Sequence, residues 1–267
     1  MRARILEVLN VSMNFGGLRA LNNVTMSIRN GEIVALIGPN GAGKTTLFNC
    51  VSGIYAPSSG TIAISPPSAQ GDATPKVINR LSPHVVAKRG LARTFQNIRL
   101  FQNMTVLENV MVGRHSLLKA GVLGAVMRDR ATRAEEEKVI HDSYEILKKL
   151  EIERYVNELA KNLPYGAQRL LEIARALATE PFLLMLDEPA AGMNPRETSH
   201  LDDLISRIRD TESVSIFLIE HDMNLVMRIS ERIYVMDYGQ LIAEGAPDEI
   251  KQDPAVIKAY LGEEVHA

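Results

Sequence analysis

The chain has 267 residues, 46% of them hydrophobic, and a formal net charge of −2. This size suits one large domain or two small ones, and the near-neutral charge gives no whole-chain attraction to nucleic acid or to an anionic membrane. No run approaches the ~18 apolar residues of a membrane-spanning helix, and the N-terminal residues lack the apolar core of a secretory signal. We therefore expect a soluble protein without a transmembrane segment.

The only cysteine, Cys50, excludes an internal disulfide and fits a reducing, cytosolic compartment. It lies in an apolar pattern, so we interpret it as a small buried side chain in preference to a reactive thiol.

Three segments in the first quarter of the chain show partial alternation of apolar and polar residues, which predicts antiparallel strands. They cover residues 5–15, 24–31 and 60–65. Three other segments are short continuous apolar runs, which is typical of strands buried on both faces of a mostly parallel sheet. These runs cover residues 32–38, 181–188 and 214–222, and helical patterns follow them at 44–52, 196–209 and 223–229. The alternation predicts an α/β core.

Residues 105–159 are almost entirely helical in pattern and include an amphipathic helix with a charged, solvated face. We expect a helical subdomain at about 105–165, inserted in the core, and a helical C-terminal tail at about 245–267. Residues 65–76 are rich in Pro, Gly and Ser and are predicted to form a mobile loop. The apolar segment 117–127 is compatible with a packed helix or with a surface that meets another protein.

The segment GPNGAGKTT follows the first apolar run, and residues 38–45 match G-x-x-x-x-G-K-[ST] at every specified position. Glycines let backbone N–H groups approach polyphosphate oxygens, and the N-terminus of the following helix favours anions. A chance match in such a chain is on the order of one in a hundred, so a phosphate-binding loop is the better interpretation than a Gly-rich turn with an ordinary surface lysine. Lys44 would reach the β- and γ-phosphates, and the Thr45 hydroxyl would ligate Mg²⁺. The predicted nucleotide-binding residues are Gly38, Pro39, Asn40, Gly41, Ala42, Gly43, Lys44, Thr45 and Thr46.

Two acidic residues end the second apolar run. Asp187 can reach Mg²⁺ directly or through water, and Glu188 is placed to polarise a water against the γ-phosphate. The alternative is a pair of acids at the solvent end of a strand. It is disfavoured because the pair follows a buried run downstream of a phosphate-binding loop.

With these motifs in place, nearly the whole chain resembles an ATP-binding subunit of an ABC transporter. The resemblance lies in six motifs in order: the loop at 38–46, RTFQN, NLPYGAQRLLEIARAL, LLMLDEP, AAGMN and LIEHDM. It implies a P-loop NTPase (RecA-like) core with an antiparallel β subdomain and an inserted α-helical subdomain, in a single ATPase domain spanning 1–267.

The resemblance also implies residue roles. Gln96 would contact the metal and γ-phosphate and link them to the membrane partner, and His221 would hydrogen-bond the γ-phosphate. Phe15 would stack on adenine, although a core aromatic is the alternative there. The implied catalytic residues are Glu188, His221, Lys44 and Gln96, and the implied Mg²⁺ ligands are Thr45, Gln96 and Asp187.

The signature segment departs from the family's common LSGGQ. Pro164 stands where the family has a serine that donates a hydroxyl to the opposite subunit's γ-phosphate, so Tyr165 and Gly166 at the helix start would face that nucleotide. The departure predicts a weaker or asymmetric composite site, unless Pro164 organises the helix start well enough to compensate.

Within the family, the sequence resembles the LivG-type subunit of branched-chain amino-acid importers most, through segments such as GLARTFQNIRLFQNMTVLENV and DPAVIKAYLGEE. This implies a peripheral ATPase on the cytoplasmic face of the membrane that binds ATP and Mg²⁺. Its implied partners are a second ATPase in a head-to-tail dimer (a LivF-type paralogue or a second copy), two permease subunits and, indirectly, an extracytoplasmic amino-acid-binding protein, with no nucleic acid. The alternatives are the same chemistry for urea, amides or lipopolysaccharide, and a soluble ABC ATPase without a membrane partner.

Overall fold

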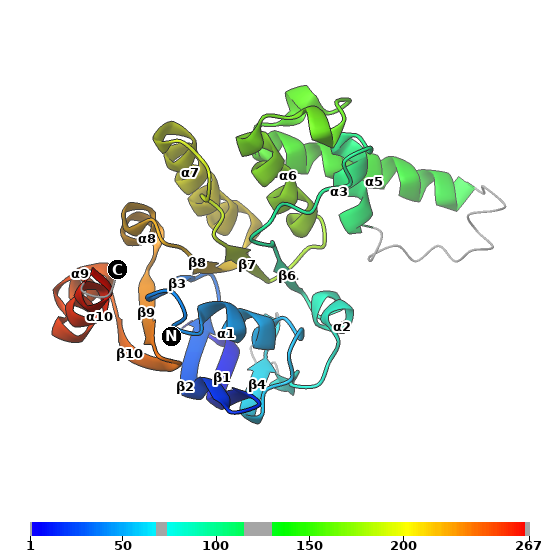
Figure 1. The fold of residues 1–267 in the computed structure, drawn as a ribbon. Helices are drawn as coiled ribbons and strands as arrows, with labels where there is room; N and C mark the ends of the chain where they lie inside the picture. Colours follow the sequence, from blue (N-terminus) through cyan, green and yellow to red (C-terminus); the bar gives the residue numbers. More distant parts are fainter. Residues whose placement is uncertain (1, 68–73, 115–129, 265–267) are drawn as a thin grey trace. The chain divides into compact units, whose positions relative to one another are not determined.

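The computed structural model describes residues 2–67, 74–114 and 130–264. The described chain divides into two compact units, which we treat separately. Unit 1 combines Met1–Arg93 with Phe182–Ala267, and unit 2 is Thr94–Pro181 (Figure 1).

The predicted α/β core is confirmed in unit 1 by a six-stranded, mostly parallel sheet with the order β10-β9-β3-β8-β7-β6. Every residue of β3, β7 and β8 is buried, as continuous apolar runs require. Only β10 is antiparallel to its neighbour. The strands are β3 Ile33–Ile37, β6 Leu91–Arg93, β7 Leu183–Asp187, β8 Ser215–Ile219, β9 Arg232–Asp237 and β10 Gln240–Gly245.

The three central strands end level with one another. Leu36 of β3 and Asp187 of β7 both pair with Ile219 of β8. Because the strands are parallel, the segments that follow them leave the sheet at the same edge, where α/β sheets place their ligands.

A second, antiparallel sheet has the order β2-β1-β4-β5 and confirms the predicted strands near the N-terminus. Its members are β1 Arg4–Phe15, β2 Leu18–Arg29, β4 Ser59–Ile64 and β5 Lys76–Val77. Helix α1, Lys44–Val51, packs with both sheets in one hydrophobic core (Figure 1). Phe48 of α1 lies 4.5 Å from Phe217 of β8 between ring centroids, and Cys50 is buried in the same core, as predicted.

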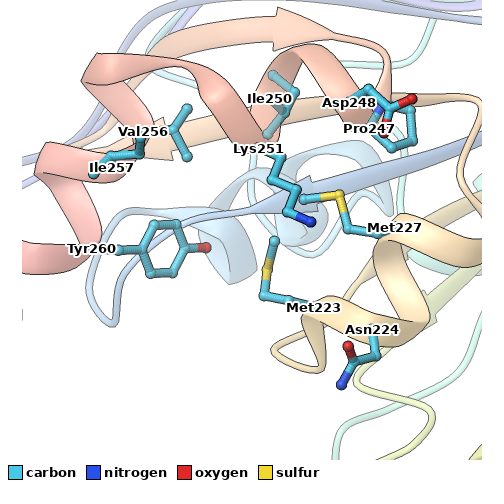
Figure 2. Close-up of a pocket in the computed structure, with 10 residues that line it drawn as sticks. All are labelled: Met223, Asn224, Met227, Pro247, Asp248, Ile250, Lys251, Val256, Ile257 and Tyr260. Carbon is cyan, nitrogen blue, oxygen red and sulfur yellow. The ribbon is translucent and has the colours of Figure 1, made fainter.

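Unit 1 also contains α2 Pro83–Lys88, α7 Pro195–Glu212, α8 Met223–Ile229, α9 Pro247–Gln252 and α10 Pro254–Glu264. Asn194 and Glu197 form a capping box that starts α7. Residues of helices α8, α9 and α10 line an open pocket of about 410 Å³ (Figure 2). Met223, Met227, Lys251 and Tyr260 line it, and no residue predicted to bind nucleotide does.

Unit 2 is helical, with α3 Val106–Arg114, α5 Arg130–Lys149 and α6 Tyr165–Leu177. It extends beyond the expected 105–165 on both sides. Helices α3 and α6 approach closely at Gly113, where an added Cβ would lie 2.4 Å from the carbonyl oxygen of Arg175. Arg114 forms ion pairs with Asp142 and Glu180 that hold the end of α3.

Some elements differ from the predictions. Strands β5, β6, β9 and β10 are additional to them. In residues 150–159 the only helix is a short 3₁₀ turn, Glu153–Tyr155, because the amphipathic pattern ends with α5. Of the predicted loop at 65–76, residues 68–73 lie outside the described part, and so does the apolar segment 117–127. Within the described residues, no helix is long and apolar enough to cross a membrane.

Candidate active site

The loop between β3 and α1 is shaped by backbone conformations that favour glycine. Gly38 has φ +149°, and a Cβ there would lie 2.1 Å from the carbonyl oxygen of Met236. Gly43 caps α1 with φ +101°. Both positions therefore require the glycines that the motif specifies. Asn40, Gly41 and Thr45 are exposed, whereas Pro39 and Ala42 are buried, so the loop presents one face to solvent at the start of α1.

Lys44 is buried, with 6% of its surface exposed. Its Nζ donates hydrogen bonds to the carbonyl oxygens of Gly38 at 2.6 Å and Pro39 at 2.9 Å. The ammonium is thus held inside the loop, where oxygen atoms of a bound phosphate would also be attracted to it.

Asp187 ends β7 with 3% of its surface exposed and forms an ion pair that the sequence-based predictions missed. Arg93 Nη2 lies 2.7 Å from Asp187 Oδ2, and Arg93 Nη1 donates to Asn49 Oδ1 at 2.7 Å and to Ser52 Oγ at 3.0 Å. Both side chains of the pair are nearly buried, so these additional hydrogen bonds fix the guanidinium and orient the aspartate. The sequence signal that could have indicated Arg93 is its position immediately before the TFQN motif.

Glu188 has φ +50°, an uncommon conformation for a residue with a side chain. Its N–H donates to the carbonyl oxygen of Ile219 at 2.9 Å. Its Oε1 lies 2.7 Å from Nε2 of His221 in the segment after β8. The structure therefore brings two predicted catalytic residues from different strands into direct contact, at the edge where the phosphate loop also leaves the sheet.

Phe15 lies at the end of β1 and is 41% exposed. Its ring makes an edge-to-face contact with Tyr55 at 5.3 Å between centroids. The core-aromatic alternative is therefore disfavoured, because much of the ring remains accessible for stacking.

The remaining predicted residues belong to unit 2. Gln96 is exposed, Tyr165 starts α6 and is 44% exposed, and Gly166 is buried. Arg169 of α6, also missed by the predictions, donates to the carbonyl oxygens of Phe95 at 3.1 Å and Gln96 at 2.7 Å. This arginine joins the signature helix to the segment that carries Gln96.

Pro164 occupies the N-cap of α6 in an extended conformation, and no side chain caps the helix. The Gln168 side chain donates instead to the carbonyl oxygen of Leu163 at 2.9 Å. The helix start is therefore organised by a proline and a glutamine, without the hydroxyl that the family's serine would supply.

A divalent cation fits the donor set of unit 1. The carboxylate of Asp187 and the hydroxyl of Thr45 are hard oxygen ligands of the type that Mg²⁺ prefers, and both lie at the carboxyl edge of the sheet. Among the described residues, no group of three or more His, Cys, Asp or Glu side chains is arranged to hold a metal without other ligands.

Two known families match parts of this chain. A family described as "ABC transporter" matches residues 21–191, which include the phosphate loop, Asp187 and Glu188. A second, described as "Branched-chain amino acid ATP-binding cassette transporter", matches residues 240–266.

Curated relatives cover almost the whole chain. The high-affinity branched-chain amino acid transport ATP-binding protein LivG of Salmonella typhimurium is 47% identical over 97% of this chain and 98% of its own length. BraF of Pseudomonas aeruginosa is 45% identical over the same shares. Among solved structures, an ABC transporter cassette in its ADP conformation has a TM-score of 0.81 at 30% identity, covering 97% of this chain and 99% of its own. A nucleotide-free cassette has a TM-score of 0.80 at 31% identity, covering 96% and 98%.

Proposed function

We propose that this chain, which belongs to the ABC transporter family of ATP-binding cassettes, hydrolyses ATP to power the import of branched-chain amino acids. The similarity to LivG and BraF along almost the entire chain supports this cargo, as does the family match at 240–266. The observation that carries the chemistry is the 2.7 Å contact between Glu188 and His221 at the sheet edge where the phosphate loop begins.

The loop amides and Lys44 would hold the β- and γ-phosphates, and Mg²⁺ would be bound by Asp187 and Thr45. The metal would neutralise charge that develops on the transferring phosphoryl group. Glu188 would orient and polarise the attacking water, and His221, which contacts Glu188, would donate a hydrogen bond to the γ-phosphate. Phe15 would stack on adenine, and Gln96 would link the metal to the membrane partner.

A second ATPase subunit would complete the site. In a head-to-tail dimer, Tyr165 and Gly166 at the start of α6 would face the nucleotide held by the partner's phosphate loop. A related bacterial cassette, 25% identical with a TM-score of 0.74, is described as dimeric. The assembly would dock on two permease subunits at the cytoplasmic face of the membrane and receive its amino acid from an extracytoplasmic binding protein.

Replacing Glu188 tests this proposal. Glu188→Gln should keep ATP binding and lower hydrolysis by about 10²–10⁴-fold, the usual range for a positioned acid–base group. Turnover is measured in the complex with permease and partner ATPase, and ATP affinity by titration. Glu137→Gln, on an exposed position of α5, is the matched control and should hydrolyse ATP normally. Wild-type turnover in Glu188→Gln would remove Glu188 from this role.

The cargo is tested separately in the reconstituted complex. Leucine, isoleucine or valine with the binding protein should stimulate ATP hydrolysis, whereas urea and amides should not. Stimulation by urea or an amide alone would contradict the cargo while leaving the ATPase assignment intact.

A further inference from the structure

Glu220 is a buried carboxylate beside the candidate active site to which no role has been given. It directly follows β8, precedes His221, and has 4% of its surface exposed. Desolvation raises the pKa of the Glu220 carboxyl, and the nearby charge of Glu188 acts in the same direction. Burial of a carboxylate is unfavourable unless its oxygens accept hydrogen bonds, so the hydrogen-bond partners of Glu220 must compensate for this cost.

The two carboxylate oxygens of Glu220 hold two different segments. Oε1 accepts a hydrogen bond from the N–H of Ala190 at 2.8 Å. Oε2 accepts from the N–H of His221 at 2.9 Å and from that of Asp222 at 3.3 Å. One side chain therefore joins the turn after β7 to the segment after β8.

The turn at Ala190 begins with Glu188. The N–H of Ala191 donates to the carbonyl oxygen of Glu188 at 3.2 Å, so fixing Ala190 also restrains the backbone that carries the candidate base. Glu188 has φ +50°, and such a conformation persists only when its surroundings over-determine it. The hydrogen bond from Ala190 to Glu220 is one of those restraints.

We propose that Glu220 is a positioning residue, which holds the backbones of Glu188 and His221 at the separation that lets their side chains meet at 2.7 Å. This inference rests on the proposed function, since it assigns Glu220 a part in the hydrolysis carried out by that pair. Glu220 acts through its neighbours and needs no contact with nucleotide.

Both side-chain oxygens of Glu220 must accept hydrogen bonds, which explains why a carboxylate stands at this position. Glutamine has the same size, but its amide carries one acceptor oxygen and one NH₂ donor. Either orientation of the amide would place NH₂ against a backbone N–H, at Ala190 or at His221, and would release that segment. Aspartate keeps the charge but is one methylene shorter, so it cannot span the two segments.

The experiment compares Glu220→Gln and Glu220→Asp with a matched control, Glu32→Gln. Glu32 is equally buried, at 4%, and its ion pair with Arg232 lies at the amino end of β3, away from the site. For each full-length variant in the assembled complex, kcat and KM for ATP are measured. In the full-length chain alone, the imidazole signals of the six histidines are recorded by NMR with selective labelling.

Both Glu220 variants should lower kcat by about ten- to a hundredfold, the effect of a small misplacement of catalytic groups, with KM for ATP changed less than about twofold. Of the histidine signals, only those of His221 should move. Glu32→Gln should melt at a lower temperature but keep kcat and the His221 signals.

Wild-type kcat in Glu220→Gln, or unmoved His221 signals, would overturn the inference. Full activity in Glu220→Asp would show that charge is sufficient without the span, and would overturn it as well. A wild-type complex that does not hydrolyse ATP would refute the proposed function instead, and the His221 signals would then decide on the positioning role alone.

Discussion

Lys44 shows how the phosphate loop is organised around a buried charge. Its ammonium donates to two carbonyl oxygens of its own loop, so the cation is already desolvated and directed in the folded chain. A phosphate that enters the loop meets a lysine with little remaining freedom, which lowers the entropic cost of binding. The side chain therefore contributes to the shape of the loop as well as to its charge.

Lys44→Ala should lower ATP affinity by about 10–100-fold, because a charge-assisted contact of about 1.5–3 kcal/mol is removed. The fold should survive, with a modest loss of thermal stability, since the two loop carbonyls lose a donor. ATP titration and thermal melting of the ligand-free protein measure the two effects. Unchanged affinity would contradict the assignment of Lys44.

The reactivity of the Cys50 thiol reports how tightly the hydrophobic core around α1 is closed. Burial raises the pKa of this thiol from 9.0 to about 11. Because the thiolate is the reactive form, alkylation by iodoacetamide at pH 8 should be at least about 100-fold slower in the folded chain than in the urea-unfolded chain. The folded-state rate should keep rising with pH toward 11, as more thiolate forms. A folded-state rate within tenfold of the unfolded one would show that the core around Cys50 opens readily.

The helices of unit 2 are fitted closely to one another. Gly113 of α3 lets the helix backbone approach Arg175 of α6 and Ala178, the residue that caps the end of α6. Gly113→Ala would place a methyl group 2.4 Å from the Arg175 carbonyl oxygen, so one helix must shift. Overpacking of this kind destabilises by about 1–3 kcal/mol.

Urea denaturation should detect this loss of stability, and hydrogen exchange should show it in the amides of α3 and α6 first. Gly17→Ala is the control, because a Cβ there meets nothing within 4 Å. Equal stability of the two variants would mean that α3 and α6 are not packed as the structure shows.

The chain combines a core unit that holds one set of predicted site residues with a helical unit that holds the signature segment. Since the Pro164 position lacks the family's serine, a homodimer would contain two sites without that hydroxyl. We expect the purified chain alone to be mostly monomeric with weak ATPase activity. A paralogous ATPase that carries the serine should be its natural partner.

Pro164→Ser should strengthen ATP-driven dimerisation by about tenfold or more, since a charge-assisted hydrogen bond to phosphate contributes about 1.5–3 kcal/mol. It should also stabilise α6 by about 0.5–2 kcal/mol through a serine N-cap that the helix now lacks. Sedimentation with ATP and thermal melting separate the two effects. Unchanged dimerisation with higher stability would show that the missing hydroxyl matters only to the helix. A tight, active wild-type homodimer would contradict the asymmetric assembly.

Local chemistry made much of this protein predictable from its sequence. The phosphate loop needs glycines where the backbone takes positive φ, so the motif specifies its own conformation. Continuous apolar runs identify β3, β7 and β8, because a strand covered on both faces has no polar side. The acids at the end of β7 follow from that assignment, since the loops of parallel strands meet at one edge.

Other features depended on contacts between residues distant in sequence, which no local pattern encodes. β6 has only three residues and becomes a strand by pairing with β7. Arg93 lies 94 positions from Asp187, and Glu220 lies 30 from Ala190, yet each makes a buried contact that orients the site. The sequence by itself determined which chemical groups are available. Only the tertiary structure decided which of them touch, because buried charges are tolerated only where the fold supplies their partners.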